Sequence, residues 1–463
     1  MYKKEEKENS LFDFNGAYGL KLDENNRWIK KAKIIPWDKI EEKYAKLFPN
    51  NIGNVAKPLR MALGSLLIQK QYNFSDVELV NEIVENPYLQ YFIGLKKFTN
   101  EKPFVPSLLV EFRKRLDEDT LIEINEMIIK NTEEKDEKDD NNKNNSGTLI
   151  LDATCAPQNI AYPQDTKILN EARKGTDKII DNICYEYNEG RPRTYRIKAQ
   201  KEFSAFAKSR KRSSKKVRKE IKALLQYLRR NIEFIRKFED KKYELKEKDK
   251  KVFETVIKIY EQQNEMYKNK THKCKDRITS LSEPFIRPII RGKVKAPVEF
   301  GAKLDLSIDG YGNARIEKLS FDSYNESEIL KKAIEKYKVR TGKYPERVLV
   351  DQIYRNTTNI KYCNERNIRI SGVPLSRQNL LDKTVDKKIA DKDNKDRIEV
   401  ERRFSLAKRK FGLGKIWTKL ENTSKSSIVL SILAMNINYM LNFFIYILKI
   451  CIFGKEKVVK IKI

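Results

Sequence analysis

Two short apolar runs, far apart in the chain, each end in an aspartate, and together they restrict the folds open to this sequence. The first run is Thr148–Asp152 and the second is Arg347–Asp351. An apolar run of this length predicts a strand that is buried on both faces, as in a sheet covered by helices. We therefore expect two neighbouring strands whose carboxyl ends present Asp152 and Asp351 at one edge of a sheet.

The segments around these two runs predict an α/β order. Apolar residues alternate with others over Val298–Ile308, and the turn Asp309–Asn313 leads into the return run Ala314–Leu319, which predicts a β-hairpin. A helix from Ser327 to about Thr341 and a strand over Ile368–Ser371 follow. Strand, hairpin, helix, strand, helix, strand and helix in this order predict a mixed sheet of the ribonuclease-H-like class.

Composition and pattern divide the 463 residues into four segments. We expect an N-terminal segment over 1–36, an all-α, DNA-binding domain over 37–131, a disordered linker over 132–147 and a catalytic domain over 148–463. The linker contains no apolar residue that it could bury. In the N-terminal domain, short helices and a basic last helix fit a helix-turn-helix-like unit, and an ordinary helical packing domain is the alternative.

A long helical insertion is expected within the catalytic domain, over about 170–290. Apolar residues recur at helical spacing between about Ile197 and Ile278, which predicts two long antiparallel helices. The cationic stretch Lys208–Lys219 belongs to this region. It is either a solvated helix face or a track for DNA phosphates.

The charge of the chain favours a polyanionic partner. There are 96 Lys and Arg against 66 Asp and Glu, a formal net charge of +30, and such a field attracts nucleic acid. A merely basic surface, from a codon bias towards Lys, is the alternative. The chain has one histidine, His272, and five widely separated cysteines. Chemistry based on His or Cys is thereby disfavoured, so carboxylates must carry any catalysis, in a protein with reduced thiols.

The C-terminal apolar segment from Ser427 to Phe453 is long enough to raise the question of a membrane span. Its middle holds Asn436, Asn438 and Asn442. We therefore predict a buried terminal helix of the catalytic core and no stable membrane partner, with peripheral membrane contact as the alternative. The N-terminus has no apolar core segment, so a cytoplasmic, nucleoid-associated bacterial protein is expected.

A third carboxylate is expected from the helical run near residue 400, where Glu399 and Glu401 compete. Residues two apart on a helix point in nearly opposite directions, so only one of them can face the sheet. Arg397, Glu401 and Lys408 share one face at steps of four and seven, which favours Glu401. Hard oxygen ligands from three carboxylates suit Mg²⁺ or Mn²⁺.

The run Arg397-(3)-Glu401-(6)-Lys408 resembles the signature of DDE transposases of the insertion-sequence four and five lineage. The segments around the two aspartates, Leu151–Pro157 with Tyr162–Asp165 and Val348–Tyr354, are also similar to that lineage. Further likeness lies in Arg287–Lys293, in Pro297–Lys303 and in the N-terminal region that ends near Leu116, so that similar segments span most of the chain.

This resemblance implies a DNA transposase that uses two-metal-ion catalysis, with Asp152, Asp351 and Glu401 holding Mg²⁺ or Mn²⁺. It implies that the protein cuts the terminal inverted repeats of its own insertion sequence and joins the 3′-hydroxyl ends to target DNA. The expected DNA contacts are Arg397, Lys408, Arg291 and Lys293. For Arg397 and Lys408 the alternative is an ion pair with acids on the same helix. Pairing of two DNA ends makes a homodimer the expected assembly.

Two other classes of protein remain as alternatives at this point. A decayed or co-opted transposase would bind DNA without cutting it, and metal-dependent nicking separates it from the enzyme. A structural protein with a coiled coil and a membrane-touching C-terminus would show detergent-dependent solubility and weak DNA affinity. The strand-end acids and the β-hairpin would have no purpose in such a protein.

Overall fold

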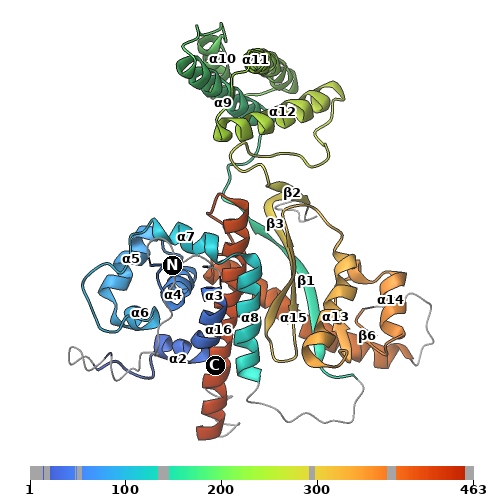
Figure 1. Cartoon of the computed structure of the whole chain (residues 1–463). Helices are drawn as coiled ribbons and strands as arrows, with labels where there is room; N and C mark the ends of the chain where they lie inside the picture. The colour runs from blue at the N-terminus through green and yellow to red at the C-terminus, as the bar shows by residue number, and fades with distance from the viewer. Residues whose placement is uncertain are drawn as a thin grey trace. The chain divides into compact units, whose positions relative to one another are not determined.

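The computed structural model describes residues 14, 21–46, 48, 55–133, 145–290, 298–372 and 382–453, with the side chains of 382–386 and 444–453 excepted (Figure 1). The chain divides into two compact units. The first unit comprises residues 1–157, 303–320 and 324–463, and the second comprises 158–302 and 321–323. Most of the expected linker, residues 134–144, lies outside the described residues.

The N-terminal part of the first unit is helical, as expected. Its helices are α2 (Arg27–Ile34), α3 (Trp37–Ala45), α4 (Leu59–Tyr72), α5 (Asp76–Glu85), α6 (Pro87–Phe92), α7 (Leu108–Arg115) and α8 (Glu118–Glu133). The capping box that opens α5 is present, because the Ser75 hydroxyl accepts from the Glu78 N–H and the Glu78 carboxylate accepts from the Ser75 N–H. These helices gather around the C-terminal helix α16 (Glu421–Phe453), which contacts α2, α4, α7 and α8 (Figure 1).

The mixed sheet has the order β2-β3-β1-β5-β6, with β4 paired to β3. The strands are β1 (Thr148–Pro157), β2 (Arg287–Ile290), β3 (Val298–Ile308), β4 (Ala314–Ser320), β5 (Arg347–Leu349) and β6 (Arg369–Ile370). β1 and β6 are parallel to β5, and β3 and β4 form the expected antiparallel hairpin. β2 pairs only with Val298–Gly301, the part of β3 that belongs to the second unit.

The expectation that the first strand ends at Asp152 is wrong, because β1 continues to Pro157. β5 stops at Leu349, so the two strands run side by side only as far as Ile150. Beyond that point β1 keeps β3 as its neighbour in the sheet, and this pairing extends the strand. Asp152 therefore lies within a strand, at the place where its parallel neighbour has ended.

The remaining elements follow the predicted order. They are the 3₁₀ turn η1 (Glu326–Glu328), α13 (Ile329–Thr341), the 3₁₀ turn η2 (Gln352–Tyr354), α14 (Thr357–Asn364) and α15 (Asp382–Lys410). Leu149 and Leu151 pack with Leu330 and Ile334 of α13. Since side chains alternate along a strand, Asp152 points to the opposite face, where α15 contacts β1.

Helix α16 carries a buried polar residue, Asn436, that bonds the β3–β4 hairpin. Asn436 is fully buried; its side-chain amide donates to the carbonyl of Ala314 at 2.7 Å and its carbonyl accepts from the Ala314 N–H at 3.0 Å. The same amide donates to Asn125 of α8 at 2.9 Å. By length and composition Glu421–Phe443 could cross a membrane, but 78% of its most apolar window is buried in the protein. The expected buried core helix agrees with these contacts.

The second unit contains a helical bundle in place of the two helices expected there. Its helices are α9 (Asp165–Glu186), α10 (Arg196–Lys208), α11 (Ser214–Asp240) and α12 (Glu247–Lys268). The two predicted long helices correspond to α11 and α12, and α10 was missed because it buries only Ala199 and so lacks a strong apolar periodicity. A buried network in which Asp177 accepts from Arg173 at 2.7 Å and from Asn231 at 3.0 Å joins α9 to α11.

Candidate active site

The strands that lead to Asp152 and Asp351, β1 and β5, are neighbours in the sheet, as predicted. Each aspartate stands two residues beyond the last paired residues of β1 and β5, Ile150 and Leu349. The Asp351 carboxylate caps η2 by accepting from the Gln352 N–H at 2.8 Å, and the Asp152 carboxylate accepts from the Ala153 N–H at 2.8 Å. The parallel register therefore places two carboxylates side by side where β5 ends.

The surroundings of Asp152 disfavour its charged form. Burial raises the pKa of Asp152 to about 6, and the carboxylates of Asp351 and Glu326 act in the same direction. The Ala153 N–H and the Arg397 guanidinium act against this shift. A half-buried carboxylate with further acids close by is a place where a cation is electrostatically favoured.

Arg397 of α15 links the first carboxylate to the third. Its guanidinium lies 3.9 Å from Asp152 and 3.6 Å from Glu401. The rival acid Glu399 instead accepts from Arg403 at 2.9 Å. The contact of Arg397 with Glu401 rather than with Glu399 supports the choice of Glu401, whose side chain is 57% exposed.

Helix α15 is fixed to the sheet by ion pairs, the main ones to the buried carboxylate of Asp393. Asp393 accepts from Arg347 of β5 at 3.1 Å and from Arg369 of β6 at 2.8 Å. Arg347 also donates to Asp396 at 2.7 Å and to the Thr148 hydroxyl at 2.8 Å. These bonds begin one turn before Arg397, so they set the rotation and height of the helix that carries Arg397 and Glu401.

The predicted triad is brought together in part. Asp152 and Asp351 are neighbours, and Glu401 is connected to them through Arg397. Within the described residues, no three acidic, histidine or cysteine side chains are close enough to form a metal site by themselves. The donor chemistry is nevertheless suitable, because carboxylate oxygens on a half-buried edge with excess negative charge fit a hard divalent cation.

Sequence reasoning missed a buried acid beneath this site, Asp305 of β3. It is fully buried and accepts from the Tyr354 hydroxyl at 2.7 Å and from the Tyr324 hydroxyl. Tyr354 ends η2, the turn that Asp351 caps, so this bond holds the turn in place. In the alternating pattern of β3, Asp305 falls among the polar positions, which are expected to face solvent. No feature of the sequence shows that this face of the strand is buried.

Glu326 is a second acid that the sequence did not single out. It pairs with Lys303 at 2.7 Å and acts electrostatically on Asp152. Its turn, η1, is tied to η2 because the Asn359 amide donates both to the carbonyl of Ser327 and to that of Tyr354, each at 2.8 Å. The two 3₁₀ turns therefore form one unit beside the carboxylate edge.

The structure gives different surroundings for the four residues that were expected to contact DNA. Arg397 is in the ion-pair arrangement that was the alternative for it, and its phosphate contact stays a prediction. Lys408 is partly buried near the end of α15. Arg291 and Lys293 lie outside the described residues. In the second unit, Arg230 and Arg193 lie over the ring of Tyr195 at 4.6 and 4.8 Å, so cations and aromatic rings are mixed on that surface.

Comparison with known proteins adds two family matches. Residues 348–438 match a family described as a transposase DDE domain, and residues 18–115 match one described as a transposase domain of type DUF772. Asp351 and Glu401 lie inside the first match, while Asp152 lies in neither. The uncharacterized protein ORF8 in the nfe locus of Rhizobium meliloti is 27% identical over 144 residues, which is 31% of this chain and 68% of that protein. No solved structure matches the chain at a significant level.

Proposed function

From the matches of residues 348–438 and 18–115 to two transposase domains, we propose that this chain is a DDE transposase that cuts and joins the DNA of an insertion sequence. Its DDE domain implies transposition catalysis by nuclease-type chemistry on DNA. We propose that the protein cuts the terminal inverted repeats of its own element and joins the 3′-hydroxyl ends to target DNA. Its resemblance to the insertion-sequence four and five lineage is part of this proposal.

The observation that carries the proposal is the position of Asp152 and Asp351, each two residues beyond the last pair of β1 and β5, with Arg397 linking Asp152 to Glu401. In this proposal the three carboxylates hold Mg²⁺ or Mn²⁺. Divalent ions at such a site supply an activated nucleophilic oxygen and stabilise the leaving oxygen in an in-line displacement at phosphorus.

The protein's own residues position the reactants in this scheme. Arg397 offers the flat, two-pronged donor that suits a phosphate, and the ion pairs it makes with Asp152 and Glu401 keep it at the carboxylate edge until DNA arrives. Lys408, about three turns beyond Arg397 on α15, supplies a point charge for the same DNA backbone. The buried Asp305–Tyr354 bond and the two linked 3₁₀ turns keep Asp351 in position.

The wider organisation follows from the same proposal. We infer that the mixed sheet with α13, α14 and α15 is a ribonuclease-H-like core and that the helical insertion and the N-terminal helices bind DNA. Pairing of two element ends would require a homodimer. A cytoplasmic protein that acts on the nucleoid, with α16 buried in its core, fits this role.

The test is cleavage of labelled duplex DNA that carries the ends of the element flanking the gene, with Mg²⁺ or Mn²⁺. The wild-type protein should produce metal-dependent 3′-hydroxyl ends, and Asp152→Ala should produce none while still binding the DNA. Tight binding without cleavage under either metal would reject the proposal in favour of a non-catalytic DNA-binding protein.

A further inference from the structure

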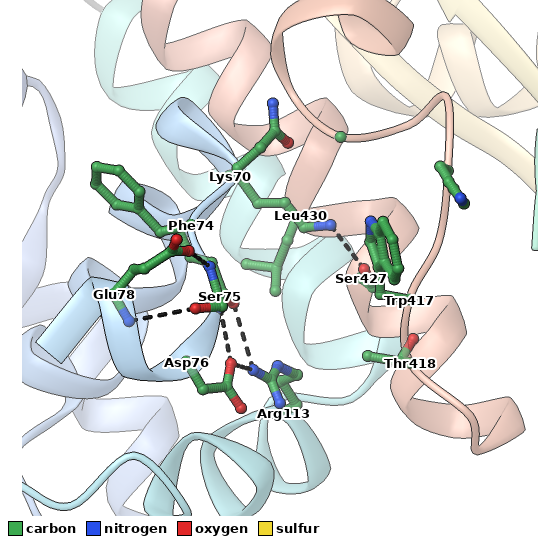
Figure 2. Close-up of a pocket in the computed structure, with 14 residues that line it drawn as sticks. Lys70, Phe74, Ser75, Asp76, Glu78, Arg113, Trp417, Thr418, Ser427 and Leu430 are labelled. Atoms are coloured by element: carbon green, nitrogen blue, oxygen red, sulfur yellow. Dashed lines mark hydrogen bonds and ion pairs between the residues drawn. The ribbon is translucent and has the colours of Figure 1, made fainter. Parts of the chain in front are cut away.

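A cavity of about 470 Å³ lies in the first unit, away from the carboxylates of the candidate active site. One wall comes from the end of α4, the start of α5 and Arg113 near the end of α7, and the other from the loop after α15 and the start of α16 (Figure 2). The first wall belongs to the segment 18–115 and the second to the segment 348–438, so the two transposase domains meet here. Its volume lies in the range of small-ligand sites.

Lys70 supplies a cation that lacks an anionic partner. Its ammonium donates to the Ser427 hydroxyl at 2.6 Å, and within the described residues it forms no salt bridge with a carboxylate. Figure 2 shows this bond beside the ring of Trp417. Burial lowers the pKa of Lys70 to about 7, and the nearby Arg113 contributes to this shift. A partly buried ammonium whose bonded partner is a neutral hydroxyl is stabilised when an anion binds beside it.

Trp417 provides a flat aromatic surface at the same cavity. Its side chain is 68% exposed, and the Lys415 ammonium lies 4.5 Å from its ring centre. The other two tryptophans, Trp28 and Trp37, are 3% and 4% exposed. An exposed indole flanked by lysines is the combination with which proteins bind unpaired bases and their phosphates.

The acids on the opposite wall are already satisfied. Asp76 pairs with Arg113 and accepts from the Gln69 amide at 2.8 Å. Glu78 is engaged in the capping box with Ser75 at 2.7 Å. The charges that remain for a ligand are therefore those of Lys70 and Lys415, both positive.

We propose that this cavity binds one unpaired nucleotide of the DNA, with its phosphate at Lys70 and Lys415 and its base against Trp417. The proposal rests on the proposed function, since it assumes that DNA is the substrate. An unpaired base is required because a paired base offers no free face to the indole. The cavity is a binding site for DNA and is separate from the carboxylates that would cut it.

The test measures Trp417 fluorescence and DNA binding in the full chain without metal. The probe is a single-stranded 12-residue oligonucleotide of mixed sequence, compared with the same sequence as a duplex, with deoxyadenosine monophosphate and with inorganic phosphate. The single strand should quench Trp417, and Trp417→Phe should remove the quenched emission. Trp417→Ala should weaken single-strand binding by about 5- to 150-fold, the range expected for one stacked base.

Lys70→Met removes the charge at nearly the same length and should flatten the salt dependence of binding by about one phosphate contact. The matched control is Lys419→Met, which removes an exposed charge close by that does not line the cavity and should leave the quenching unchanged. Circular dichroism of each variant verifies folding.

Equal quenching by duplex and single strand, or no quenching by either, would overturn the proposal. Binding of inorganic phosphate as tight as that of the single strand would also overturn it, by identifying a small-anion site, whereas quenching by deoxyadenosine monophosphate and none by phosphate supports it. Because cleavage is not measured, loss of the cavity proposal leaves the carboxylate chemistry standing, and failure of cleavage leaves the binding result intact.

Discussion

Asp152 and Lys70 are two half-buried charges of opposite sign, and each stands in surroundings that favour its neutral form. Burial raises the pKa of Asp152 to about 6 and lowers that of Lys70 to about 7. Among the described residues, the cation near Asp152 is Arg397 at 3.9 Å, and the bonded partner of the Lys70 ammonium is the Ser427 hydroxyl. In both places the protein's own residues compensate the charge incompletely, so the sign of the charge identifies the ligand that would complete the site.

The two regions differ in how they are held. The carboxylate edge rests on side-chain bonds between different elements, such as Asp305 of β3 with Tyr354 of η2 and Asp393 of α15 with Arg347 of β5. The cavity is lined by the ends of helices and by a loop, with an exposed ring at its rim. Reaction at phosphorus needs groups fixed within a fraction of an ångström, whereas binding of a nucleotide tolerates adjustment. The comparison therefore fits our proposals of chemistry in the first region and recognition in the second.

The largest expected effect comes from Asp152→Asn. The neutral isostere should reduce cleavage by a factor on the order of 10³ or more, because a carboxylate essential to the reaction is lost. The folded-state pKa of Asp152 exceeds that of an unfolded aspartate, so at pH 7 the charged form destabilises the fold, and the substitution should raise the free energy of unfolding by roughly 1–3 kcal/mol. Cleavage assays and denaturant unfolding measure the two quantities. A variant that cleaves normally would break the comparison.

The next effect concerns Arg397. Arg397→Met should reduce cleavage by about 10²-fold, since the group that orients phosphate and joins Asp152 to Glu401 is removed. Arg397→Lys should restore only part of this, because an ammonium cannot make the two-pronged contact. Arg402→Met is the control, since Arg402 is exposed and pairs with Glu399 on the same helix. Equal losses in both Met variants would assign the effect to the helix charge instead.

The order of the elements along the chain and the hairpin could be predicted because they depend on local patterns. The period-two alternation of β3 and the apolar runs of β1 and β5 survive in the structure with small changes of boundary. The length of β1 could not be predicted, since it depends on β3 remaining its neighbour after β5 has ended. Helix α10 was not predicted because it has only one buried residue and therefore no clear apolar periodicity.

The acids of the candidate site could be predicted from the sequence, but the residues that support them could not. Asp152 and Asp351 follow apolar runs, and helical spacing favoured Glu401 over Glu399. Asp305, Tyr354 and Glu326 are far apart in the sequence and meet only through tertiary packing. The cavity likewise joins residues near 70 and near 420, and no local pattern connects them. For the carboxylate edge, the candidate reacting groups can therefore be identified from the sequence, whereas the residues that hold them in place are identified only from the structure.

A smaller effect is expected from the support under Asp351. Tyr354→Phe removes the hydroxyl that donates to the buried Asp305 carboxylate, and leaving that oxygen unpaired should reduce the free energy of unfolding by about 1–3 kcal/mol. Cleavage should fall by roughly tenfold through looser placement of η2. Tyr362→Phe is the matched control, because its hydroxyl also bonds a carboxylate, that of Glu335, away from the site. If the control lowers cleavage as much, Tyr354 has no special role in positioning Asp351.

The smallest expected effect is a pH dependence of DNA binding at the cavity. In the absence of DNA, Lys70 with a pKa of about 7 loses its charge as the pH rises from 6 to 8.5, so single-strand binding should weaken by about fivefold over that range. Arg113 on α7, Asp76 and Glu78 on α5, and Lys415 in the loop are the other charged groups that face the cavity, and Ser427 lies on α16.

Lys70→Arg keeps the charge throughout this range, so its binding should change little with pH while all the other groups are retained. Fluorescence titration at each pH, at constant ionic strength, gives the measurement. If the arginine variant shows the same fivefold decline as the wild type, the pH dependence comes from another group. Lys70 would then not carry the phosphate, and the cavity would no longer be the cationic counterpart of the carboxylate edge.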